Sequence, residues 1–338
     1  MNALNPLRCE RKNLWSKFIW IGLVILNGCS SRSADNVLHE PSNEKTISVV
    51  TTIGMLADIV REVGGEHVSV TQLMGPGVDP HLYKPNRDDI QSILDCDIVF
   101  YAGHHLEGKM AATLEKIKNQ KPIIALSERL DDKLLILDDQ SQVDPHLWMD
   151  VSLWTGLLDP IAAELQRVSP EHSGVFERNS KMTQQRLMQL HQYGLNAIAS
   201  IPESQRTLIT SHDAFRYFGR AYNLEVLGVQ GISTESEAGL QRINELVDMI
   251  TLQQIPAIFI ESSVPQKNID SLIEGSRARG HSVSIGGELY SDAMGESGTP
   301  EGTYLGMMAH NIKTVTKALG GSAKEFPLVE HGSLQDEK

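Results

Sequence analysis

The sequence predicts an α/β fold of two similar lobes, each a mostly parallel sheet flanked by helices, joined by one long rigid linker helix. Short β-rich runs alternate with helical stretches from residue 46 onward, which is typical of βα units. A long stretch from about 170 to 200 then carries apolar residues at helical spacing and no strand signal. The alternation resumes after it, so we expect a second lobe on the far side of the helix.

The amino-terminal segment precedes this fold. Basic residues lead into a short apolar run at 18–26, and Leu-Asn-Gly follows directly ahead of Cys29. This order is typical of a secretory signal peptide over 1–28, whose apolar run is too short to span a membrane. A small residue followed by Cys29 resembles a bacterial lipobox, so we expect Cys29 to be lipidated, with simple cleavage nearby as the alternative. The polar residues 29–45 are expected to form a flexible tether.

The amino-terminal lobe is expected to span 46–168. Its predicted strands lie at 47–52, 68–73, 98–102 and 123–126, and its predicted helices at 54–63, 87–94, 106–117 and 151–168. The linker helix is expected within 169–201, because Ser169 suits an N-cap, Pro170 suits the first turn and Pro202 stops the helix.

The carboxy-terminal lobe is expected to span 202–321, followed by a polar tail at 322–338. Its predicted strands lie at 206–210, 225–229, 257–260 and 282–285, and its predicted helices at 214–222, 237–253, 266–279 and 303–319. The two lobes therefore repeat one strand-and-helix alternation.

Charge and cysteine content limit the class of protein. A formal net charge of −13 argues against nucleic acid as a partner, because nucleic acid requires a basic face. The chain has 3 cysteines. Cys9 would leave with the signal peptide and Cys29 would carry the lipid, so Cys96 remains alone and no intrachain disulfide is expected. Core packing must then supply the stability.

One short motif occurs twice in the first lobe. The residues around His81 read Val-Asp-Pro-His-Leu, and the same five residues surround His146. Proline fixes the backbone ahead of each histidine, which favours two rigidly held imidazole ligands for a metal. Asp-Pro is also the pattern of a capped helix start, so two ordinary helix caps are the alternative.

The second lobe contributes two further candidates, each just past a predicted strand. His212 follows the strand at 206–210, and Asp292 lies in a glycine-punctuated loop after the last strand. In open α/β sheets ligands bind beyond the carboxyl ends of strands, so His81, His146, His212 and Asp292 are expected to meet between the lobes. A helix N-terminus beside His212 is expected to keep that imidazole neutral. Either residue, taken alone, suits a structural role equally well.

Several motifs together resemble the TroA-like metal-binding receptors of bacterial ABC-type manganese/zinc importers. The resemblance spans essentially the whole mature chain, and its matching segments are Gly77-Val78-Asp79-Pro80-His81, Asp144-Pro145-His146-Leu147-Trp148, Ser211-His212-Asp213-Ala214-Phe215, Gln230-Gly231-Ile232-Ser233-Thr234, Ile258-Phe259-Ile260-Glu261-Ser262-Ser263 and Ser291-Asp292-Ala293-Met294-Gly295. It implies the same two lobes and linker helix, with the four residues reached above as metal ligands.

The resemblance also implies the function. We expect an extracytoplasmic, membrane-anchored lipoprotein that faces the periplasm or cell exterior, binds one Zn²⁺ or Mn²⁺ as cargo, and needs no organic cofactor. Its expected partners are an ABC permease with its cytoplasmic ATPase, and the protein itself is expected to be a monomer and no enzyme. A secreted zinc-dependent hydrolase is the alternative, since zinc enzymes keep three ligands and an open position. An adhesin or organic-ligand receptor on the same fold is another.

Two departures from the family pattern bear on the metal. The manganese-leaning branch usually carries Glu where this chain has His212, and the zinc branch often carries a long His-rich loop where this chain has only His104 and His105. We interpret those two as loop residues, with auxiliary metal capture as the alternative. The choice among zinc, manganese and iron, the identity of the permease and the membrane concerned all stay open. Glu261 is expected to support a ligand rather than bind metal, and affinity is expected to fall below about pH 6.

Overall fold

The computed structural model describes residues 46–138 and 140–328. The expected signal peptide at 1–28, Cys29, the rest of the tether to residue 45 and the end of the polar tail at 329–338 lie outside the described residues. The described residues belong to one compact unit, Lys45–Lys338. In the portion that is described, no helix combines the length and apolar character needed to cross a membrane.

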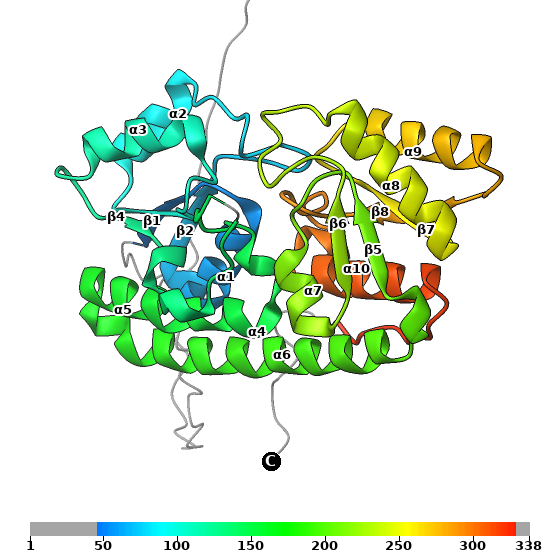
Figure 1. The fold of residues 1–338 in the computed structure, drawn as a ribbon. Helices are drawn as coiled ribbons and strands as arrows, with labels where there is room; N and C mark the ends of the chain where they lie inside the picture. Colours follow the sequence, from blue (N-terminus) through cyan, green and yellow to red (C-terminus); the bar gives the residue numbers. More distant parts are fainter. Residues whose placement is uncertain (1–45, 139, 329–338) are drawn as a thin grey trace, which may run out of the picture. The chain divides into compact units, whose positions relative to one another are not determined.

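The first lobe is built on a four-stranded parallel sheet in the order β2-β1-β3-β4. The strands are β1 (Ile47–Thr51), β2 (Val68–Gln72), β3 (Ile98–Tyr101) and β4 (Ile123–Ala125). Helix α1 (Gly54–Gly64) lies on one side of the sheet, and α2 (Arg87–Asp95) and α3 (Gly108–Ile117) lie on the other (Figure 1). The central strands are apolar along most of their length because helices cover both faces.

The helix predicted over 151–168 is interrupted, so that detail of the prediction was wrong. The structure has α4 (Val151–Trp154), a 3-10 turn (Thr155–Leu157) and α5 (Leu158–Val168). Pro160 explains the break, because it has no N–H to donate to the carbonyl of Gly156 four residues earlier. The break lets α4 and α5 pack separately against the linker helix.

The linker helix α6 (Ser173–Ala199) has 27 residues, about 40 Å at 1.5 Å per residue. It runs beneath both lobes (Figure 1), contacting α1, α4 and α5 in the first and α7 and α10 in the second. At Gly194 the second lobe comes so close that a Cβ would lie 2.6 Å from the ring of Tyr222. The two lobes are therefore joined by a rigid helix that packs against both of them along its length.

The second lobe contains two pairs of parallel strands. They are β5 (Thr207–Thr210) with β6 (Glu225–Gly228), and β7 (Ala257–Glu261) with β8 (Ser284–Leu289). The helices are α7 (Arg216–Tyr222), α8 (Leu240–Gln253), α9 (Lys267–Ala278) and α10 (Tyr304–Ala318). Strand β8 continues four residues past its predicted end at 285, through two glycines, with a bulge opposite Ile258 and Phe259. Glycine permits that irregular backbone at Gly287, where φ is 146°.

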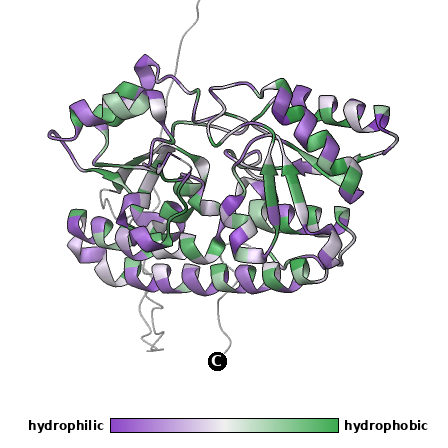
Figure 2. Ribbon diagram, in the orientation of Figure 1, coloured by the Kyte–Doolittle hydropathy of each residue, from purple (hydrophilic) through white to green (hydrophobic). Residues whose placement is uncertain are grey.

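The apolar core does not stop at the boundary between the lobes. Its larger cluster includes Val49 and Ile98 in the first lobe and Phe218 and Ile312 in the second. A smaller cluster lies between the second-lobe strands and α8 and α9. In Figure 2 the strands β5 and β6 are strongly hydrophobic, whereas α6 alternates between hydrophobic and hydrophilic turns. A shared core opposes any wide separation of the lobes, because apolar surface would be exposed to water.

Candidate metal centre

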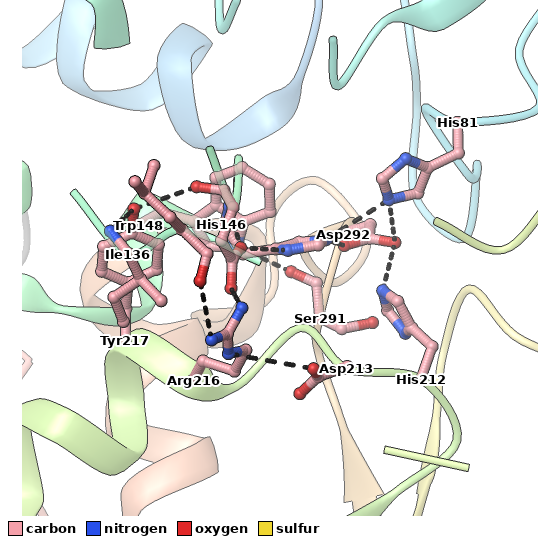
Figure 3. Close-up of polar contacts among 12 residues, drawn as sticks. His81, Ile136, His146, Trp148, His212, Asp213, Arg216, Tyr217, Ser291 and Asp292 are labelled. Carbon is pink, nitrogen blue, oxygen red and sulfur yellow. Dashed lines mark hydrogen bonds and ion pairs between the residues drawn. The ribbon is translucent and has the colours of Figure 1, made fainter. Parts of the chain in front are cut away.

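The four residues predicted as ligands come from four separate loops and meet between the lobes. His81 lies in the loop from β2 to α2, and His146 immediately precedes a 3-10 turn ahead of α4. His212 follows β5, and Asp292 follows β8. One possible ligand atom from each residue lies within 4.8 Å of all the others (Figure 3). Within 46–138 and 140–328 this is the one such group of three or more potential metal ligands.

The ligand atoms converge tightly on one point. The Nε2 atoms of His81 and His146 are 3.3 Å apart. Asp292 places its Oδ1 3.4 Å from Nε2 of His146, and its Oδ2 3.2 Å from Nε2 of His212 and 3.9 Å from Nε2 of His81. Three imidazole nitrogens and a carboxylate thus face a common centre, a donor set that suits zinc and also admits manganese.

All four side chains are buried, and several of their polar atoms make no hydrogen bond. His146 and His212 are 0% exposed, Asp292 is 2% exposed and His81 is 4% exposed. Nε2 of His212 and both carboxylate oxygens of Asp292 have no hydrogen-bond partner in the described structure. Buried polar atoms are costly to leave unpaired. A cation at the common centre would satisfy all three, so the residues fit a metal ion.

A carboxylate holds the imidazole of His146. Nδ1 of His146 donates to Oδ1 of Asp144 at 2.8 Å, and the backbone N–H of His146 donates to the same oxygen at 3.0 Å. The Asp-Pro-His motif is therefore a local turn closed by the aspartate, and not the start of an α-helix. The first motif makes the same backbone contact, from the N–H of His81 to Oδ1 of Asp79 at 2.8 Å. The helix-cap alternative for the repeated motif is not what the structure shows.

Glu261 at the end of β7 holds His212 in the corresponding way. Its Oε2 accepts from Nδ1 of His212 at 2.5 Å, and its Oε1 accepts from the backbone N–H of His212 at 2.9 Å. Each contact leaves Nε2 of its histidine directed at the common centre. Such outer carboxylates fix the tautomer and the ring orientation of a metal ligand.

Buried carboxylates set the charge of the site. Burial alone disfavours the charged ring of His146, but the hydrogen bond to Asp144 and the proximity of Asp292 raise the pKa of His146 to about 9. Burial likewise opposes charge on His212, but Glu261 and Asp292 raise the pKa of His212 well above its usual value. Without a metal ion these carboxylates favour a charged ring on His212, whereas the helix-terminus argument led us to expect a neutral one. Helix α7 begins only at Arg216, and two carboxylates face the ring directly.

His81 and Asp292 are shifted the other way. Burial, helped by the neighbouring histidines, lowers the pKa of His81 to about 4. Burial opposes ionisation of Asp292, yet the charges of His212 and His146 hold the pKa of Asp292 well below its usual range. At neutral pH the ion-free centre thus carries two imidazolium rings, one neutral ring and one carboxylate.

Contacts between the lobes position the loop that carries His146 (Figure 3). The indole N–H of Trp148 donates to the carbonyl of Ser291 at 2.8 Å, next to Asp292. The hydroxyl of Tyr217 on α7 donates to the carbonyl of Asp144 at 3.0 Å and accepts from the N–H of Ile136 at 3.0 Å. The first-lobe loop is thereby tied to two second-lobe elements.

A cavity of about 510 Å³ lies beside the centre, and His81 is the candidate ligand that lines it. His104 and His105 line the same cavity, with φ angles of 48° and 65°. They do not join the cluster of four, which agrees with interpreting them as loop residues and leaves their function untested.

The main role of Asp144 was not predicted from the sequence, in which Asp-Pro suggested only a helix cap. The repeated spacing of Asp two residues before His was the available signal. Asp150 does act as a cap, accepting from the N–H groups of Ser152 and Leu153 at the start of α4. Glu261 makes the contact with His212 that a residue supporting a ligand would make.

Comparisons with known proteins agree with this geometry. The model of the family described as "Zinc-uptake complex component A periplasmic" matches residues 49–318. The manganese-binding lipoprotein MntA of Bacillus subtilis is 46% identical over 295 residues, covering 87% of this chain and 95% of that protein. The zinc-binding protein TroA of Treponema pallidum is 44% identical over 271 residues, covering 80% and 88%.

Solved structures give the same result. The periplasmic zinc-binding protein TroA from Treponema pallidum aligns with a TM-score of 0.80 and 43% identity, over 82% of this chain and 100% of that one. A second TroA structure, from a study of its metal-binding specificity, aligns with a TM-score of 0.77 and 33% identity. The chain belongs to the periplasmic zinc-uptake component A (ZnuA) family of metal-binding proteins.

Proposed function

We propose that this protein binds a divalent transition-metal ion outside the cytoplasm and delivers it to the permease of an ABC importer. The observation that carries the proposal is the buried cluster of His81, His146, His212 and Asp292, with three unpartnered polar atoms facing one centre. Relatives named as ABC transporter substrate-binding lipoproteins support delivery to a permease and its cytoplasmic ATPase.

The cargo is one ion per chain, either Zn²⁺ or Mn²⁺. One relative is named for manganese and another for zinc. Three imidazoles favour zinc, and zinc binds such sites more tightly than manganese by the Irving–Williams order. The metal supplied outside the cell therefore decides which ion occupies the site.

The donor set supports a receptor over a hydrolase. Four protein ligands complete a tetrahedral zinc site, whereas a catalytic zinc keeps one position open for water. The buried geometry also suits storage of the ion during transit, because water does not reach the ligands freely.

Anchoring completes the proposal. Residues 1–28 are removed, Cys29 carries the lipid, and 29–45 tether a monomer whose lobes at 46–168 and 202–321 flank the linker at 169–201. Relatives named as lipoproteins support the anchor. Incorporation of a labelled fatty acid, absent in Cys29→Ala, tests it, and light scattering of the purified mature chain tests the monomer.

The metal content of the mature protein purified from its own host tests the function. We expect one equivalent of zinc or manganese in the wild type and none in His212→Ala. His105→Asn is the control, because His105 is exposed and asparagine tolerates its positive φ. Retention of metal by His212→Ala, with unchanged circular dichroism, would contradict the assigned site.

A further inference from the structure

The three histidines are not held in the same way. His146 and His212 each donate from Nδ1 to a buried carboxylate. In the described part of the chain no residue accepts a hydrogen bond from Nδ1 of His81, and the polar and ring contacts of its side chain are with His146, His212 and Asp292. The hydrogen bonds that hold His81 are therefore made by its backbone and not by Nδ1.

Asp79 supplies that backbone contact and passes it to the other lobe. One carboxylate oxygen of Asp79 accepts from the N–H of His81 at 2.8 Å. The other accepts from the hydroxyl of Thr234 at 2.5 Å, across a sequence separation of 155 residues. Asp79 and Thr234 are both partly buried, so this bridge is only partly screened by water.

Thr234 lies in a segment that also supports His212. We call residues 230–235, between β6 and α8, the strap. The N–H of Gln230 donates to the carbonyl of Ser211 at 3.0 Å, and the N–H of Asp213 donates to the carbonyl of Gly231 at 3.2 Å. The strap is thus bonded on both sides of His212 and reaches across to His81 through Thr234.

His81 is the candidate ligand that reaches the cavity. It lines the cavity together with Gly231, Ile232 and Ser233 of the strap, whereas the other three ligands do not. Displacement of His81 would therefore open the ion to that cavity while His146, His212 and Asp292 stay in place.

We propose that Thr234 is a positioning residue for the metal: through Asp79 it holds His81 over the other three ligands and so sets how fast the ion leaves. The inference rests on the function proposed above and adds the step that controls release. The hydroxyl of Thr234 is the group that matters, because its single hydrogen bond completes the connection between the strap and the loop carrying His81.

The test compares dissociation rates of zinc from the loaded mature protein after mixing with excess pyridylazoresorcinol, a chromogenic chelator. Thr234→Val has the shape of threonine without the hydroxyl, and we expect it to release zinc about tenfold faster, the lower end of outer-ligand effects. Thr234→Ser keeps the hydroxyl and should release zinc at the wild-type rate.

Two controls separate positioning of His81 from general loosening. Glu235→Gln removes a second polar contact between the strap and the first lobe, the exposed 3.6 Å pair with Lys109, and should change the rate less than Thr234→Val does. In a His81→Ala background, Thr234→Val should give no further acceleration, because the residue it positions is gone.

The outcomes are distinct. Equal rates for wild type and Thr234→Val, rapid release from Thr234→Ser, or a full effect of Thr234→Val in the His81→Ala background would each overturn the inference while leaving metal binding intact. A wild-type protein that binds no zinc would instead refute the proposed function.

Discussion

Acidification should weaken metal binding by about 100-fold per pH unit between about pH 5 and pH 8. In that range the ion-free protein holds a proton on His146, with its pKa of about 9, and another on His212, whose pKa is also raised well above its usual value. His81 holds none, because its pKa is lowered to about 4. A metal ion needs all three rings deprotonated, so it expels two protons.

The size of this pH dependence follows from the coupling between proton release and metal binding. Two protons released per ion change the free energy of binding by about 2.7 kcal/mol per pH unit, because each costs about 1.36 kcal/mol. The direction is a loss of affinity as pH falls, since protons compete with the ion for the same nitrogens. If the three histidines had ordinary pKa values, the metal affinity would hardly depend on pH above pH 7.5 and would begin to fall near pH 6.5.

Isothermal titration calorimetry measures the proton count. Zinc is titrated into the apoprotein at pH 7.5 in several buffers of different ionisation enthalpy, and the slope of the observed enthalpy gives the protons released, after correction for zinc–buffer complexes. We expect about two. A value below one would refute the argument that buried carboxylates keep His146 and His212 protonated.

Two further predictions concern the outer carboxylate and the linker helix. Glu261→Gln should weaken zinc binding about 10- to 100-fold in chelator competition, because it removes the charge that orients His212. Glu288→Gln is the control, since Glu288 is exposed on β8, and should leave the zinc affinity unchanged. Equal zinc affinities for the two variants would count against the role of Glu261. Gly194→Ala should lower the free energy of unfolding by about 1 kcal/mol, because the overlap with Tyr222 outweighs the helix propensity gained. Gly174→Ala in the same helix is the control, because its Cβ would meet only the flexible end of an arginine side chain at 3.6 Å, and it should not destabilise the protein. Urea unfolding measures the stability of both variants. A Gly194→Ala variant more stable than the wild type would show that the packing around Gly194 is looser than described.

The alternation of strands and helices was enough to predict the two-lobed α/β fold and the linker helix. The spacing of apolar residues and the positions of glycine and proline are local properties of the chain, so a single sequence is enough to show them. The four members of the metal cluster were predictable for a related reason. His212 and Asp292 each follow a strand, and ends of parallel strands gather at one edge of a sheet. The repeat around His81 and His146 supplied the other pair.

What the sequence could not predict depends on distant partners. The raised pKa of His212 comes largely from Glu261, 49 residues later in the chain, whereas the local sequence suggested a neutral ring. The bridge from Asp79 to Thr234 spans 155 residues and has no periodic signature. The break in the helix predicted over 151–168 has a local cause, because Pro160 lies within that stretch.

The position of Trp148 provides an optical probe that requires no added dye. Its indole ring lies 5.3 Å from the ring of His146 and 6.2 Å from that of Trp154. The chain has 4 tryptophans, and Trp15 and Trp20 fall within the expected signal peptide. The tryptophan fluorescence of the mature protein then arises from one edge-to-face pair of indoles beside the metal centre. Exchange of an imidazolium proton for a metal ion at His146 changes the charge next to that pair, so the emission should report cargo loading in the unlabelled protein.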